Sequence, residues 1–143
     1  MLRWNANFES GHASIDAQHR TLILFINRLE RLTKNTNPTP DEGEATVGFI
    51  DFLENYILRH LQEEENKLVQ LRCPTGAAGK RVENEFTEFY REFKQRFAIE
   101  GYRPHIVKEL SGACASWLED HIASVEARLK LCRTKLPEPM NAN

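Results

Sequence analysis

The amino-acid sequence predicts an all-α protein, an up-down-up-down antiparallel four-helix bundle with an N-terminal arm. Four long segments repeat apolar residues every three or four positions and contain almost no helix breaker. Stretches rich in proline and glycine separate these segments. Short connections between long helices favour antiparallel neighbours. We expect a single domain over 1–143, with an arm at 1–14 and a loose tail at 136–143.

The first two helices are expected at about 15–34 and 42–71, joined by the turn NTNPTPDEG at 35–43. Ser14 or Asp16 is available to cap the first helix. Apolar side chains form an inward stripe along each helix. In the first helix this stripe holds Ile15, Leu22, Ile26 and Leu29, and in the second it holds Val47, Ile50, Leu53 and Ile57.

The last two helices are expected at about 78–98 and 104–135. The turns RCPTGAAG at 72–79 and EGYRP at 100–104 precede them, and Pro104 suits the first turn of a helix. Helical spacing makes the phenylalanines of the third helix core residues. The inward stripes are Val82, Phe86, Phe89, Phe93 and Phe97 in the third helix, and Val107, Leu110, Cys114 and Trp117 in the fourth.

The composition is that of a globular domain, with 41% hydrophobic and 28% charged residues among 143. A formal net charge of −2 gives no electrostatic case for nucleic acid or an anionic membrane. No signal peptide is visible, and no apolar run approaches the roughly 20 residues that cross a bilayer. Cys73, Cys114 and Cys132 form an odd set without framework spacing, so we expect free thiols and a cytoplasmic location.

Polar residues interrupt the inward stripes at His19, His60, Glu64 and His121. Each histidine by itself is better explained as a hydrogen-bonded core residue than as a ligand. A buried carboxylate such as Glu64 is harder to dismiss, because without a partner it costs several kcal/mol or must stay protonated.

The topology brings these polar residues to one level of the bundle. At about 1.5 Å per residue, His19 and His60 lie roughly 22–28 Å from the first turn, and His121 roughly 25 Å from the third turn. Glu64 follows His60 by one helical turn and points the same way. Glu126, five residues beyond His121, is placed to swing back toward this layer. Imidazoles and carboxylates converging between helices are typical of transition-metal sites, so these five residues are the candidate ligands.

Three motifs in the sequence resemble the hemerythrin family. HASIDAQHRTL is similar to the family's first-helix I-D-x-Q-H run, which delivers a ligand here at His19. HLQEEENKL resembles the second-helix H-x-x-x-E, and WLEDHIASVEARL resembles the fourth-helix W-L-x-x-H-I-x-x-x-D-x-x-L, with Glu126 in place of aspartate. The resemblance implies a single-domain bacterial hemerythrin fold with non-haem iron, in which bridging carboxylates hold two ions and one ion keeps a position for O₂.

The third helix departs from the family's pattern. Hemerythrins usually place H-x-x-x-H there, whereas RVENEFTEF has Val82 and Phe86 at those positions, and Phe89 matches the phenylalanine that follows. Neither Val82 nor Phe86 can bind a metal.

Three outcomes remain open from the sequence. One is a single ion held by His19, His60 and Glu64, with Glu126 as a further candidate ligand. In that case His121 would lie beside the ion, and Phe86 would fill the volume that a histidine usually occupies. A second is a pair of ions in which Glu85 turns inward as a replacement ligand. The third is a site that has lost metal altogether, which the cost of burying so many polar groups disfavours.

The sequence therefore predicts a protein that binds or senses O₂ or another small oxidant through one or two non-haem irons. Weak peroxidase activity is an alternative, as is a metal-free or zinc-only bundle that serves as an interaction or sensory module. No motif indicates a covalent nucleophile, a phosphate loop or a dinucleotide site, so no catalytic residue is assigned.

Overall fold

The computed structural model of the chain describes residues 1–73 and 76–135, except for the side chains of 76–80, 82, 83 and 133–135. The expected loose tail at 136–143 lies outside the described residues. Elsewhere the chain forms one short 3-10 helix and four long α-helices, and no strand occurs in the described residues. The elements are η1 (Ala6–Phe8), α1 (Ala13–Leu32), α2 (Pro40–Gln70), α3 (Gly76–Glu100) and α4 (Pro104–Lys135).

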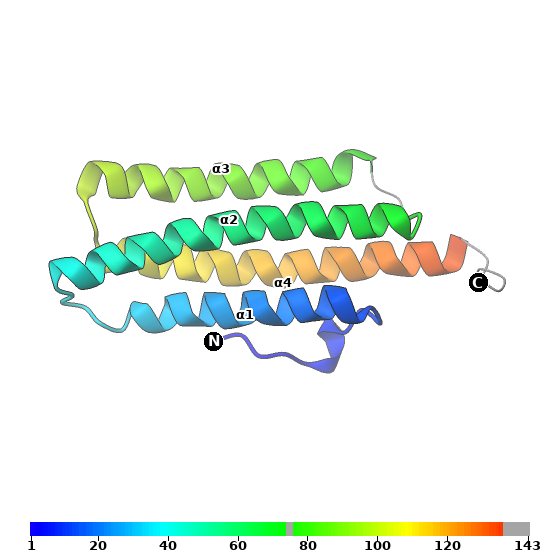
Figure 1. Cartoon of the computed structure of the whole chain (residues 1–143), viewed down its shortest axis with the longest axis horizontal. Coiled ribbons are helices and arrows are strands. Elements are labelled where there is room, and N and C mark those ends of the chain that lie inside the picture. Colours follow the sequence, from blue (N-terminus) through cyan, green and yellow to red (C-terminus); the bar gives the residue numbers. More distant parts are fainter. Residues whose placement is uncertain (74–75, 136–143) are drawn as a thin grey trace.

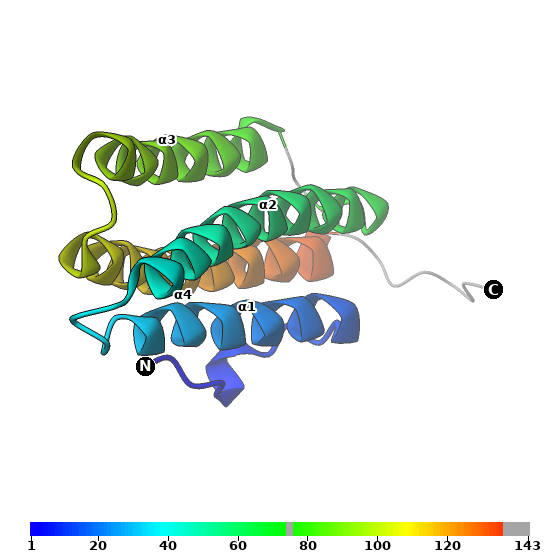
Figure 2. The same ribbon diagram turned by 60° about the vertical axis from the view of Figure 1, so that its left-hand side comes forward.

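The four helices alternate in direction and form the predicted all-α antiparallel bundle, so the fold prediction is confirmed (Figures 1 and 2). α1 contacts α2 and α4, and α3 contacts the same two helices from the other side. Every predicted helix end lies within two residues of its position in the structure. The N-terminal segment runs back along α1 (Figure 1), where Leu2 and the side chain of Asn27 exchange hydrogen bonds of 3.0 and 2.8 Å.

The helix starts show which capping predictions hold. α2 begins with a capping box, in which the Glu42 N–H donates to Thr39 Oγ1 and the Thr39 N–H donates to Glu42 Oε1. The expectation that Ser14 or Asp16 caps the first helix is wrong, because α1 begins earlier, at Ala13. The Asp16 carboxylate instead accepts the Ser10 N–H at 3.0 Å and ties the arm to the helix.

Apolar residues form two buried clusters that are separated along the helix axes. The larger contains Leu22, Ile57, Phe86 and Leu118, and the smaller contains residues nearer the α2–α3 connection, including Leu68. In the sequence, His19 and Glu64 each fall between a residue of the larger cluster and one of the smaller, whereas His60 and His121 lie at the end of the larger cluster's residues on α2 and α4. The polar layer is therefore enclosed on both sides by hydrophobic core.

The cysteine prediction is wrong for two of the three residues. Cys73 and Cys132 form a disulfide, with their Cα atoms 4.8 Å apart. The bond joins the segment after α2 to the last part of α4. These cysteines are 59 residues apart, and only the antiparallel fold brings them to the same end of the bundle. Cys114 is free, as expected, and its burial raises the pKa of the thiol to about 12.

None of the helices in the described part of the chain is both long and apolar enough to span a bilayer.

Candidate metal centre

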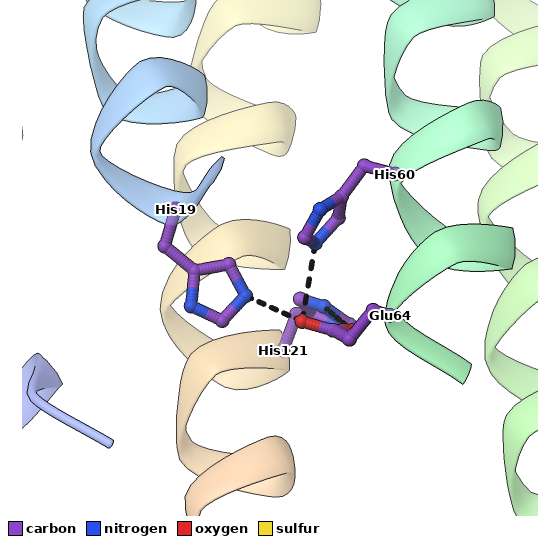
Figure 3. A group of neighbouring side chains, drawn as sticks. All are labelled: His19, His60, Glu64 and His121. Atoms are coloured by element: carbon purple, nitrogen blue, oxygen red, sulfur yellow. Dashed lines mark hydrogen bonds and ion pairs between the residues drawn. The ribbon is translucent and has the colours of Figure 1, made fainter. Parts of the chain in front are cut away.

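Four of the five candidate ligands converge in the bundle. His19 comes from α1, His60 and Glu64 from α2, and His121 from α4 (Figure 3). One ligating atom from each side chain lies within 4.8 Å of those of the other three. All four residues are buried, with exposed fractions between 1% and 6%. Helical spacing explains the arrangement on α2, since residues four apart lie on the same face.

The carboxylate of Glu64 lies at the centre of this group. Its Oε2 is 2.6 Å from His19 Nε2 and 3.2 Å from His60 Nε2, and its Oε1 is 2.7 Å from His121 Nε2. Three imidazoles therefore surround a single carboxylate (Figure 3). Only the contact with His19 is a hydrogen bond by its geometry, whereas Nε2 of His60 and Nε2 of His121 have no hydrogen-bond partner among the described residues.

The His60 ring is oriented by a residue that the sequence analysis did not single out. Nδ1 of His60 donates to the side-chain oxygen of Gln18 at 2.6 Å. In a neutral imidazole with its proton on Nδ1, Nε2 carries a lone pair. That lone pair faces a carboxylate oxygen, which also carries lone pairs. Such an arrangement is stable only with a proton or a metal ion between the two atoms. Position 18 falls within the quoted first-helix motif, but nothing in the sequence identifies its partner.

The ionisable groups in this layer have shifted pKa values. Burial is the main reason that the pKa of His60 is lower than usual, and the nearby Glu64 carboxylate opposes this shift. Burial alone would raise the pKa of Glu64, but the surrounding imidazoles, with His121 the strongest, hold it well below its usual range. The layer therefore favours an ionised carboxylate and a neutral His60, which are the forms that bind metals.

Aromatic rings cover the side of the layer that faces α3. The Trp117 indole stacks on the His121 imidazole, with ring centres 5.0 Å apart and an angle of 10° between the planes. Phe86 is fully buried, and its ring centre lies 5.0 Å from that of Trp117. This agrees with the expectation that Phe86 is a core residue.

The two other carboxylates considered in the sequence lie outside the group. Glu126 is partly buried on α4 and is not among the residues whose ligating atoms converge. The side chain of Glu85 is 69% exposed and lies 3.9 Å from Arg81. The hypothesis that Glu85 turns inward is therefore wrong in this structure, because the α3 face that meets the core is occupied by Phe86. The side chain of Val82, the other α3 position at which hemerythrins usually have histidine, lies outside the described residues.

A small cavity adjoins the layer between α2 and α4. Its volume is about 20 Å³, enough for one water-sized molecule, and Glu64 and His121 are part of its lining. Arg128 and Glu65 also line it, and they form two parallel hydrogen bonds of 2.9 and 3.1 Å. This ion pair stands between α2 and α4 next to the candidate ligands.

The donor set fits a first-row transition-metal ion. Imidazole nitrogens with a carboxylate suit iron, manganese, cobalt and zinc. Three of the imidazole nitrogens here, Nδ1 of His19 and Nε2 of His60 and of His121, lack a hydrogen-bond partner among the described residues. The hydrogen bond from His60 Nδ1 to an amide oxygen is the usual support for a histidine ligand, because it fixes the tautomer that binds metal through Nε2.

Comparison with known proteins agrees with these features. The family model of the hemerythrin HHE cation binding domain matches residues 10–130. A bacteriohemerythrin of Stenotrophomonas maltophilia is 30% identical over 85% of this chain and 74% of its own length. Bacteriohemerythrins of Pseudomonas aeruginosa and Clostridium acetobutylicum are 26% and 25% identical, covering 88% and 85% of this chain and 77% and 93% of their own lengths. No solved structure matches the chain.

Proposed function

Because the chain belongs to the family of hemerythrin HHE cation binding domains, which bind non-haem iron, we propose that it binds iron through an altered set of ligands and binds or senses O₂ or a related small oxidant. The relatives named bacteriohemerythrin support the choice of iron. The observation that carries the proposal is the buried layer of His19, His60, Glu64 and His121.

The physical argument is one of charge and hydrogen bonding. Around an ionised Glu64 that is 3% exposed, the imidazoles leave polar atoms whose hydrogen-bonding capacity is not met by the described residues. A bound cation would satisfy the lone pairs of His60 and His121 and neutralise the carboxylate. Without it, the layer is a costly interruption of an apolar core.

Each residue would have a defined task in such a site. Iron supplies the capacity to bind O₂ or another oxidant and to change oxidation state. His19, His60, His121 and Glu64 would hold the ion, and Gln18 would keep the proton of His60 on Nδ1. The apolar clusters on both sides of the layer would exclude bulk water.

Binding or sensing is favoured over sustained peroxide turnover by the form of the site. The adjoining cavity, which Glu64 and His121 help to line, admits one water-sized molecule. Glu126 remains a candidate further ligand, since it lies five residues beyond His121 on the same helix. We also propose a cytoplasmic location for the protein, where iron is available as Fe(II).

The test is the iron content and iron-dependent stability of the protein expressed with iron present. We expect bound iron and a visible spectrum that changes on exposure to O₂. Removing iron with a chelator should lower the Tm by about 10 °C, if iron at about 100 times its Kd adds about 2.7 kcal/mol.

Two variants complete this test. Glu64→Gln should lose the iron and the chelator response, whereas Glu63→Gln, its exposed neighbour on α2, should keep both. The proposal would be rejected in favour of a metal-free module if the protein were colourless, held no stoichiometric metal and had the same Tm with and without the chelator. Stoichiometric zinc in place of iron would reject the oxygen function but keep the metal site.

A further inference from the structure

The ligands of the candidate centre come from only three of the four helices. α1 provides His19, α2 provides His60 and Glu64, and α4 provides His121. On α3, no described side chain belongs to the group. The four donors therefore surround one point from three sides. The fourth side, which faces α3, is closed by aromatic side chains.

Aromatic rings from α3 and α4 close the fourth side. Phe86 from α3 lies against Trp117, and Trp117 lies parallel to His121 at 5.0 Å. Phe86 also contacts Tyr90, whose hydroxyl donates to the backbone oxygen of Ile50 at 2.6 Å and is thereby fixed in place. The rings of Phe86 and Trp117 lie between His121 and α3, and neither of these two rings offers a metal ligand.

The number of nearby carboxylates limits the charge that the layer can hold. Glu64 is the only carboxylate among the converging residues, and both of its oxygens already face imidazoles. Counting the charges of protein side chains alone, one divalent ion with Glu64 leaves one positive charge, whereas two divalent ions leave three. If Glu126 also contributed, one ion would give a neutral site and two would still leave two buried positive charges. Uncompensated charge in an apolar interior is strongly unfavourable.

We propose that this centre binds a single metal ion, held by three imidazoles and the Glu64 carboxylate, and that Phe86 and Trp117 close the α3 side, where a second ion would need ligands. The inference rests on the proposed function, because it specifies the number of ions at the same site. The donor set also indicates the kind of ion. It is one first-row transition-metal ion that accepts nitrogen and carboxylate ligands, and iron is the ion expected in this family.

The test is the number of ions bound per chain, measured without any activity assay. Metal-free protein is titrated with Fe(II) under nitrogen, and bound iron per chain is determined after removal of the excess. We expect saturation at one ion. After oxidation, an isolated Fe(III) ion is paramagnetic, so an electron paramagnetic resonance signal should account for all the bound iron. An oxo-bridged Fe(III) pair is antiferromagnetically coupled and gives no such signal.

Two glutamate variants locate the ion. Glu64→Gln should lose the bound iron. Glu85→Gln is the matched control, since Glu85 is exposed and paired with Arg81, and it should keep one ion per chain. Two ions in the natural protein, or the loss of an ion in Glu85→Gln, would overturn the inference while leaving the metal-binding proposal intact. No bound metal at all would overturn the proposed function itself.

Discussion

The His60 imidazole donates its Nδ1 proton to the side-chain oxygen of Gln18, on the neighbouring helix, over 2.6 Å. This contact fixes the ring so that Nε2 faces Glu64. A histidine ligand that loses such a supporting hydrogen bond typically binds its metal 10- to 100-fold more weakly, because its tautomer and orientation are no longer set.

We therefore expect Gln18→Leu to weaken metal binding by about 10- to 100-fold, measured as the apparent Kd for Co(II) or Fe(II) in a competition titration. Gln18→Glu, which keeps an acceptor for the same proton, should retain tight binding. Gln62→Leu is the control, because it makes the same substitution at an exposed position of α2 and should leave the affinity unchanged. Equal affinities in Gln18→Leu and the natural protein would show that the hydrogen bond has no role.

The metal-free protein should lose stability in mild acid because of His60. Its folded-state pKa is lower than the unfolded value of 6.5, so the unfolded chain binds the proton more readily. Stability is therefore full above about pH 6.5 and declines as the pH falls from there toward the folded-state pKa. Glu64 acts in the same direction only below its unfolded value of 4.5, so the two effects fall in separate windows.

Thermal unfolding of the metal-free protein between about pH 7.5 and about pH 5.5 checks this expectation. His60→Gln should flatten the decline, whereas His105→Gln, at an exposed position near the start of α4, should leave it unchanged. A Tm that stays constant, or rises, on acidification in the natural protein would contradict it.

Reducing the disulfide should destabilise the fold. The Cys73–Cys132 bond closes a loop across a sequence separation of 59. By the chain-entropy relation such a bond is worth about 4 kcal/mol, which corresponds to a Tm change on the order of 10 °C. Differential scanning calorimetry with and without a thiol reductant measures the effect.

The matched variants separate this bond from the remaining thiol. Cys73→Ala/Cys132→Ala should have a low Tm that no longer responds to reductant. Cys114→Ala changes the free, buried cysteine and should keep the full response. If the natural protein melted at the same temperature in both conditions, the bond would contribute nothing to stability.

The Arg128–Glu65 ion pair should limit how quickly small ligands reach the centre. The pair lines the same small cavity as Glu64 and His121. Shortening either side chain widens this cavity toward solvent. We expect azide, a small anionic probe, to bind the iron-loaded Glu65→Ala variant at least severalfold faster than the natural protein in stopped-flow measurements.

The control is Glu109→Ala, which removes the exposed ion pair between Arg96 and Glu109 on α3 and α4. Its azide binding rate should match that of the natural protein. Identical rates in Glu65→Ala and Glu109→Ala would mean that ligands reach the centre by another path.

The sequence was sufficient for the helices and for the level at which the polar residues meet. Helical periodicity and the proline- and glycine-rich turns are local signals, and they placed every helix end within two residues. A constant rise per residue then put His19, His60 and His121 at one height in an antiparallel bundle. Residues four apart on a helix share a face, so Glu64 was correctly expected beside His60.

Only the tertiary structure decided which side chains actually touch. The Cys73–Cys132 bond, the Gln18–His60 hydrogen bond and the outward position of Glu85 each depend on the rotation of one helix against another. A periodic sequence gives the buried face of a helix but leaves that rotation uncertain by tens of degrees, because many apolar side chains pack almost equally well. Here the buried ring of Phe86 and the partly buried ring of Trp117 occupy the space beside His121, and Glu85 faces solvent.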